Sequence, residues 1–200
     1  MVNSLAKNLI ITAAHCVSGN PLGMRFVPGY LNGSTPEGTW TVQAAYADRR
    51  WIQFQDPRFD YAFLRVAKTD GHALEDVVRG FPMRTPAAPE QVEAVGYGAG
   101  QDDEPITCGG NTHVFDAGSH GKYLEFDCPG FVDGTSGSPF LASGDVDTGA
   151  IVGVIGGLHA GGCIDSISYS STLDRNAFSL LVRAIAGRSS DVLPAARSDC

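Results

Sequence analysis

The stretch Gly134-Thr135-Ser136-Gly137-Ser138-Pro139 is the most informative part of this sequence. It flanks a serine with glycines, which let a chain turn tightly and bring backbone N–H groups close to another group. Thr12-Ala13-Ala14-His15-Cys16 lies upstream, and Phe59-Asp60-Tyr61-Ala62-Phe63-Leu64 lies between the two. Each string alone is ordinary, since it also fits a loop, a core histidine or a turn aspartate. Together, in the order histidine, aspartate and serine, they supply a base, an acid that orients it and a hydroxyl.

The three strings resemble the motifs of the chymotrypsin–trypsin family of serine proteases, in that family's order. Gly96-Tyr97-Gly98 also resembles the strand end G-W-G or G-Y-G of that family's second barrel. The likeness covers roughly residues 2–187 and is greatest to secreted bacterial trypsin-like and glutamyl-endopeptidase-like members. Subtilisins and α/β-hydrolases carry the same three residue types in other orders.

The resemblance implies a serine endopeptidase that acts on protein or peptide substrates through an acyl-enzyme. Ser136 is then the nucleophile, His15 the general base and Asp60 the residue that orients the base. The N–H groups of Gly134 and Ser136 would form the oxyanion hole. This chemistry needs no metal and no organic cofactor.

Three other assignments are disfavoured by the sequence. Ser138 is the rival nucleophile, but it stands where the G-x-S-x-G elbow of α/β-hydrolases requires glycine. Asp56 is the rival acid, but Pro57 follows it, whereas the family has a hydrophobic residue and often alanine after its aspartate. A metal site at His15 and Cys16 is disfavoured, because adjacent residues on a strand point to opposite faces.

Short β-like runs separated by turn residues predict an all-β sandwich or barrel. The predicted strands are Leu9–Thr12, Met24–Val27, Thr39–Tyr46, Tyr61–Val66, Gln91–Tyr97, Tyr123–Phe126, Pro139–Ala142 and Ile151–Ile155. The resemblance refines this to two six-stranded antiparallel Greek-key β-barrels with the active site in the cleft between them, plus a C-terminal α-helix.

The expected domain limits follow from this reading. An N-terminal barrel spans 1–82, a Pro-rich linker 83–89, a C-terminal barrel 90–170, a helix 171–187 and a flexible tail 188–200. In the helix, Ser171 or Thr172 is the predicted cap, and Phe178, Leu181 and Ile185 share one predicted face. Gly187 is the predicted stop.

Charge and hydropathy exclude several classes of partner. The formal net charge of −8 argues against nucleic-acid binding, because an acidic surface repels phosphates. No apolar run approaches the ~20 residues that span a bilayer. We therefore expect a protein that binds neither nucleic acid nor membrane, and we separately expect a monomer.

The five cysteines are scattered and form no CxxC pair, which favours disulfides and an oxidising compartment. We expect a secreted protein, with no signal peptide in the given chain. Cys108–Cys128 is the preferred disulfide because it closes a modest loop. The alternative, Cys128–Cys163, resembles the family's bridge beside the substrate pocket. Cys200 has no predicted role.

Two departures from the family bear on activity. Thr135 stands where animal trypsins have an aspartate before the nucleophile. The family's first strand, and the cysteine that often pairs with the one at Cys16, would lie before Met1, so the first barrel is expected to lack a strand. The alternative function is therefore a catalytically inactive protease-fold binding module or an inactive truncated fragment.

Substrate preference is only weakly indicated. Gly130 loosely matches the floor of the trypsin pocket, Asp133 is expected at its rim, and His159 is a candidate for substrate contact. The other histidines, His72, His113 and His120, are expected in loops.

Overall fold

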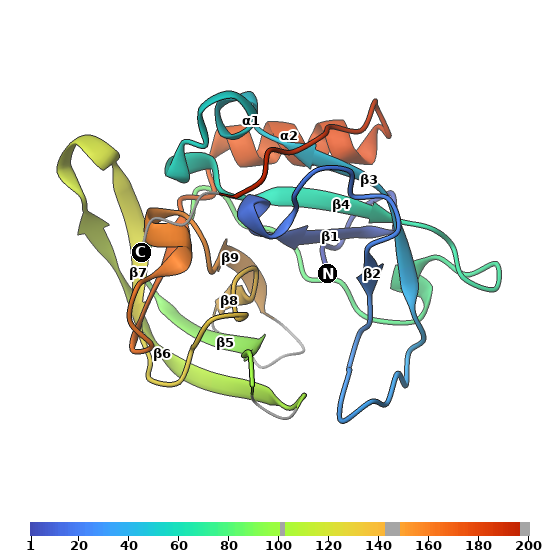
Figure 1. Ribbon diagram of the computed structural model, residues 1–200, viewed down its shortest axis with the longest axis horizontal. Coiled ribbons are helices and arrows are strands. Elements are labelled where there is room, and N and C mark those ends of the chain that lie inside the picture. The colour runs from blue at the N-terminus through green and yellow to red at the C-terminus, as the bar shows by residue number, and fades with distance from the viewer. Residues whose placement is uncertain (101–102, 143–148, 197–200) are drawn as a thin grey trace.

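The computed structural model describes residues 1–100, 103–142 and 149–196. It is mostly β, with two curled antiparallel sheets that lie side by side and two α-helices above the first sheet (Figure 1). The all-β prediction with two antiparallel units and a C-terminal helix is confirmed. Within the described part, the first sheet has four strands where six were expected.

The first sheet has the strand order β1-β4-β3-β2. Its strands are β1 (Leu9–Thr12), β2 (Arg25–Phe26), β3 (Trp40–Ala47) and β4 (Ala62–Val66). Most of β1, β3 and β4 is buried, which suits their content of Val, Ile, Leu, Phe and Ala. The bridge from Val2 to Leu9 adds the start of the chain to this unit.

The second sheet has the order β10-β7-β6-β5-β8-β9. Its strands are β5 (Gln91–Tyr97), β6 (Pro105–Asp116), β7 (Lys122–Asp127), β8 (Pro139–Ala142), β9 (Ala150–Val154) and β10 (Ile167–Ser171). The antiparallel bridge from Ile155 to Ser170 joins the two edge strands and closes the sheet into a barrel. Two clusters of buried side chains fill the interiors, and the first also includes α2 and Leu193.

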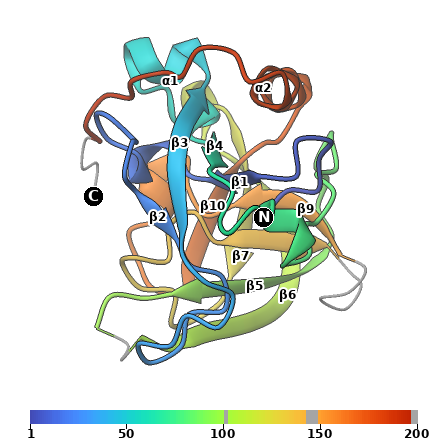
Figure 2. The same ribbon diagram turned by 90° about the vertical axis from the view of Figure 1, so that its right-hand side faces the viewer.

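Helix α2 (Arg175–Ile185) packs on the first sheet, although it follows the second in sequence (Figures 1 and 2). Its N-cap is Asp174, whose carboxylate accepts from the N–H groups of Asn176 and Ala177. The predicted caps, Ser171 and Thr172, were therefore wrong by two to three residues. The predicted stop is confirmed, since Gly187 follows the helix with φ +63°.

The buried face of α2 also differs from the prediction. Ala177, Leu180, Leu181 and Ala184 are buried, whereas Phe178 is 53% exposed. The buried stripe therefore follows the i, i+3, i+4, i+7 spacing that starts at Ala177 rather than at Phe178. At the far end, the Arg65 guanidinium of β4 donates to the carbonyls of Ala184 and Ile185.

The segment after α2 lies against the first sheet. Ser190 Oγ accepts from Ala45 N–H, and the Asp191 carboxylate accepts from Ala47 N–H and from Arg183. Leu193 is buried and pairs with Gly19. The last four residues, Cys200 among them, lie outside the described part of the chain.

The preferred disulfide is confirmed: Cys108 of β6 is bonded to Cys128, which directly follows β7. The alternative of Cys128 with Cys163 was therefore wrong. Cys16 is a free, exposed thiol.

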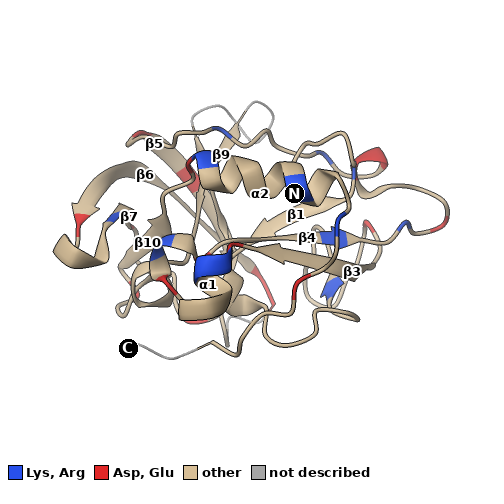
Figure 3. Cartoon of the chain, turned by 90° about the horizontal axis from the view of Figure 1, so that it is seen from above, with Lys and Arg blue, Asp and Glu red and all other residues tan. Residues whose placement is uncertain are grey.

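Charged residues of both signs are dispersed over the loops and helices (Figure 3). Among the described residues, no helix has the length and apolar character that a membrane crossing requires.

Candidate functional site

His15 and Asp60 are brought together by the pairing of β1 with β4. Thr12 lies opposite Ala62, so the residues just after β1 and just before β4 meet at one end of the sheet. His15 lies in one short 3-10 turn, Ala14–Cys16, and Asp60 ends another, Pro57–Phe59. A sequence separation of 45 residues is thereby reduced to direct contact.

Asp60 is fully buried, and each carboxylate oxygen has partners. Oδ2 lies 2.7 Å from His15 Nδ1 and accepts from Gly157 N–H at 2.8 Å, while Oδ1 accepts from the His15 N–H at 2.8 Å. The carboxylate thus fixes both the backbone and the ring of His15. With Asp60 ionised, Nδ1 carries the proton and Nε2 is left to act as an acceptor.

Gly156 and Gly157 lie in the segment after β9 of the second sheet and approach Asp60 closely. A Cβ on Gly156 would lie 3.1 Å from both Asp60 O and Asp60 Oδ2, and 3.0 Å from the Ala13 side chain. Glycine therefore lets the two barrels meet closely at this carboxylate, since a larger residue would require its neighbours to shift by a few tenths of an ångström.

Ser136 lies in the loop before β8, and its neighbour Gly137 contacts the first barrel. Gly137 has φ +85°, and a Cβ there would collide with the Thr12 hydroxyl and lie 3.3 Å from Ala13 N. Glycine at this position lets the serine loop dock beside the strand that leads to His15.

The peptide between Asp133 and Gly134 is held from outside the serine loop. The Asp133 carbonyl accepts a hydrogen bond from Ala99 N–H at 2.6 Å. Since C=O and N–H point in opposite directions across a planar trans peptide, the N–H of Gly134 points away from Ala99. Gly134 and Ser136 both line the cavity described next.

A cavity of about 870 Å³ is lined by His15 and Ser136. Its wall is formed by the serine loop, by residues 159–165 and by the start of β10, with Asp133, His159 and Asp165 as further charged or titratable members. Ala196 also lines it. Gly130 is not among the described lining residues, so the loose match to a pocket floor has no support.

The Ser136 hydroxyl has an unexpected partner, because its Oγ donates to the Ala160 carbonyl at 3.4 Å. His159 and Ala160 both have φ +51°, a left-handed conformation that is uncommon for residues other than glycine. The hydrogen bond of the Ser136 hydroxyl is therefore accepted by a backbone carbonyl of this turn rather than by the His15 imidazole.

The pKa of His15 is shifted by opposing effects. Burial lowers it, whereas the hydrogen bonds to Asp60 and to Cys16 and the negative charge of Asp60 raise it. The net result is a pKa above the ordinary value for histidine, because the protonated ring faces a buried carboxylate.

Sequence reasoning named the three side chains but missed the backbone groups that hold two of these side chains and the serine loop. These are the N–H groups of Gly157 and Ala99 and the carbonyl of Ala160. Every residue type except proline offers the same backbone donor and acceptor, so no residue pattern could have revealed these groups. The histidine at 113, expected in a loop, lies instead on β6.

Solved protease structures share this architecture. The protease Anisep from Arthrobacter nicotinovorans has 25% identity and a TM-score of 0.80, with 92% of this chain and 86% of that chain covered. A thermostable serine protease, AL20, from an extremophilic microorganism has 21% identity and a TM-score of 0.81, with 94% and 89% covered. A Glu endopeptidase has 19% identity and a TM-score of 0.72, with 92% and 84% covered.

No match was found among curated protein sequences. The sequence does match the family described as trypsin-like peptidase domain over residues 2–154, a span that includes all three motifs. The chain therefore belongs to the trypsin-like peptidase family.

Proposed function

We propose that the chain is a serine endopeptidase, with Ser136 as nucleophile, His15 as general base and Asp60 as the residue that orients the base. The observation that carries the proposal is the Asp60 carboxylate, buried and bonded to both the ring and the backbone of His15, next to a cavity lined by His15 and Ser136. The three solved neighbours are proteases, which supports the same class of reaction.

In the proposed reaction, the Ser136 hydroxyl turns from the Ala160 carbonyl toward His15 Nε2 and loses its proton there. Oγ then bonds to the scissile carbonyl carbon, and the carbonyl oxygen becomes an oxyanion. The N–H groups of Gly134 and Ser136 stabilise this charge, and one such donor contributes about 3–4 kcal/mol.

His15 next passes its proton to the leaving nitrogen, and the C–N bond breaks to give an acyl-enzyme. Water, activated by the same imidazole, releases the acid and regenerates the serine. Asp60 stays ionised throughout and stabilises the imidazolium.

The substrate is a peptide or protein, and secretion fits the disulfide between Cys108 and Cys128, because such bonds persist in oxidising compartments. Contact between His159 and a substrate side chain stays a prediction, supported by its place in the cavity wall.

The test is covalent labelling with a fluorescent fluorophosphonate, followed by mapping of the adduct by mass spectrometry. We expect the label on Ser136, hydrolysis of casein by the unmodified protein, and loss of both in Ser136→Ala. Ser138→Ala is the matched control and should keep both. A folded protein that neither labels nor hydrolyses would favour the inactive binding module instead.

A further inference from the structure

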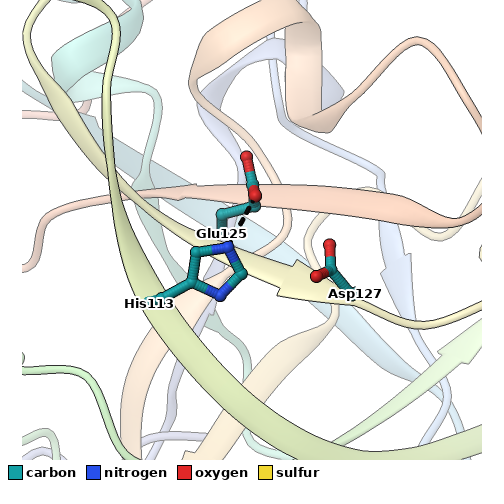
Figure 4. A group of neighbouring side chains, drawn as sticks. All are labelled: His113, Glu125 and Asp127. Carbon is teal, nitrogen blue, oxygen red and sulfur yellow. Dashed lines mark hydrogen bonds and ion pairs between the residues drawn. The ribbon is translucent and has the colours of Figure 1, made fainter.

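Three side chains with metal-binding atoms converge on one face of the second barrel, from β6 and β7 (Figure 4). His113 of β6 lies directly opposite Glu125 of β7 in the strand register. Asp127 follows two residues later on β7 and therefore points to the same face as Glu125.

The spacing of these atoms is close to that of a zinc coordination sphere. His113 Nε2 lies 2.7 Å from Glu125 Oε1, and one ligand atom of each residue lies within 4.8 Å of the others. Ligands at about 2.0 Å from a tetrahedral Zn²⁺ are about 3.3 Å apart. The His–Glu pair must open by roughly 0.6 Å and Asp127 must close by at most about 1.5 Å, which side-chain rotation permits at an exposed aspartate.

The Glu125 side chain is held in place by its neighbours on both adjacent strands. Its side chain is only 12% exposed, and it lies between His113 on one neighbouring strand and Tyr169 on the other. The Tyr169 hydroxyl interacts with the Glu125 carboxylate. A partner that orients a ligating carboxylate in this way is a common feature of metal sites.

The donor set distinguishes between ions. One imidazole nitrogen and two carboxylate oxygens suit Zn²⁺, whereas Ca²⁺ takes six to eight oxygens and Mg²⁺ favours octahedral oxygen coordination. Two carboxylates beside one imidazole also leave a net negative charge that attracts a cation.

We propose that His113, Glu125 and Asp127 form a Zn²⁺ site, completed by water, that clamps the outer part of β6 to β7. The pairing of β6 with β5 ends at Asn111, so His113 lies on a part of β6 that pairs only with β7 among the described strands. An ion there would hold this outer part of β6 against β7. The proposal is independent of the proteolytic activity.

The test is titration of Zn²⁺ into the full Ser136→Ala chain, which prevents self-cleavage, with calorimetry and thermal unfolding as readouts. We expect one ion per chain and a rise in Tm of a few degrees. His113→Ala and Asp127→Asn should each weaken this binding at least tenfold and abolish the rise, while Ca²⁺ and Mg²⁺ should not produce it.

Two control variants address the competing ligands in the same Ser136→Ala background. His72→Ala removes an exposed histidine elsewhere, and His15→Ala removes the histidine beside the free thiol of Cys16. Both should keep the stoichiometry and the rise in Tm. The proposal is overturned if millimolar Zn²⁺ does not bind, if His113→Ala binds as well as its parent, or if His15→Ala abolishes binding.

Discussion

The buried Asp60 carboxylate accepts hydrogen bonds from His15 of the first barrel and from Gly157, which follows β9 of the second barrel. Asp60→Asn would keep the shape but place an amide against His15 Nδ1, which favours the wrong tautomer. We expect kcat to fall about 10⁴-fold with little change in the fold, as for such a substitution in a Ser-His-Asp site. Steady-state kinetics with a circular-dichroism check measures both.

Asp56→Asn is the control for that variant. Asp56 caps the 3-10 turn Pro57–Phe59 and pairs with Arg58, and asparagine can accept the same backbone hydrogen bond. Its kcat should stay within a few-fold of the unmodified protein. Equal losses in both variants would reject Asp60 as the orienting residue.

The raised pKa of His15 predicts the pH profile of the reaction. Only the neutral imidazole accepts the serine proton, so kcat/KM should increase as pH rises and His15 loses its proton. Because Asp60 stabilises the protonated ring, the midpoint should lie above the reference value of ~6.5 and should move down in Asp60→Asn. A midpoint at or below the reference would contradict this assignment.

For single residues, the sequence predicted which side chains meet at the candidate site far better than it predicted the groups to which they hydrogen-bond. The strings around His15, Asp60 and Ser136 singled out the proposed reactive groups because few chemistries need that set. The hydrogen bond from Ser136 Oγ to the Ala160 carbonyl depends on a turn in which two residues other than glycine adopt the left-handed conformation. No local sequence pattern indicates such a turn.

Among the elements, the serine loop depends on one glycine for its approach to β1. Gly137→Ala should lower kcat/KM at least about 100-fold, because the added methyl group displaces Ser136 from His15 and a shift near 1 Å has that effect. Kinetics and urea unfolding of the variant test this.

Gly33→Ala is its matched control, since Gly33 has φ +82° and nothing within 4 Å of an added Cβ. Both variants carry a similar conformational cost of about 1–2 kcal/mol. Only Gly137→Ala should lose activity; retained activity there would show that the close approach is not required.

The cap of α2 gives a second prediction at this scale. Asp174→Ala should lower stability by about 1 kcal/mol, because two N–H groups of the first turn lose their acceptor. For a chain of this size, Tm should fall by about 2–4 °C in thermal unfolding. Thr172→Ala should have little effect, since Thr172 Oγ1 bonds to Lys122 O outside the helix; the reverse result would restore the earlier assignment.

The strands missed by sequence reasoning share a cause. β6 contains Gly109 and Gly110, which are typical of turns, yet a Cβ on Gly110 would lie 3.1 Å from the Phe126 ring. β10 is rich in serine, and the buried Ser170 hydroxyl satisfies Val154 N–H. Both compositions are set by neighbours distant in sequence, whereas the Val- and Leu-rich strands carried their own signal. Helix α1 (Arg49–Phe54) is too short for its periodicity to show.

For the whole molecule, the bond between Cys108 and Cys128 restricts the unfolded chain. It joins residues 20 apart in sequence, and a loop of that size corresponds to about 3 kcal/mol. The double variant Cys108→Ser with Cys128→Ser should lose about this free energy of unfolding in urea. Its activity at 25 °C should persist, because neither cysteine lines the cavity.

Cys16→Ser controls for the loss of a thiol, since Cys16 is free and exposed. Its unfolding midpoint should be nearly unchanged. A double variant as stable as the unmodified protein would show that the loop is already restricted when unfolded.

The core of the first barrel includes Leu181 of α2 and Leu193, although its own strands end at Val66. A ribosome releases β1 to β4 long before it adds these residues. The apolar face of the first sheet is therefore covered in full only after residues 175–193 have been synthesised.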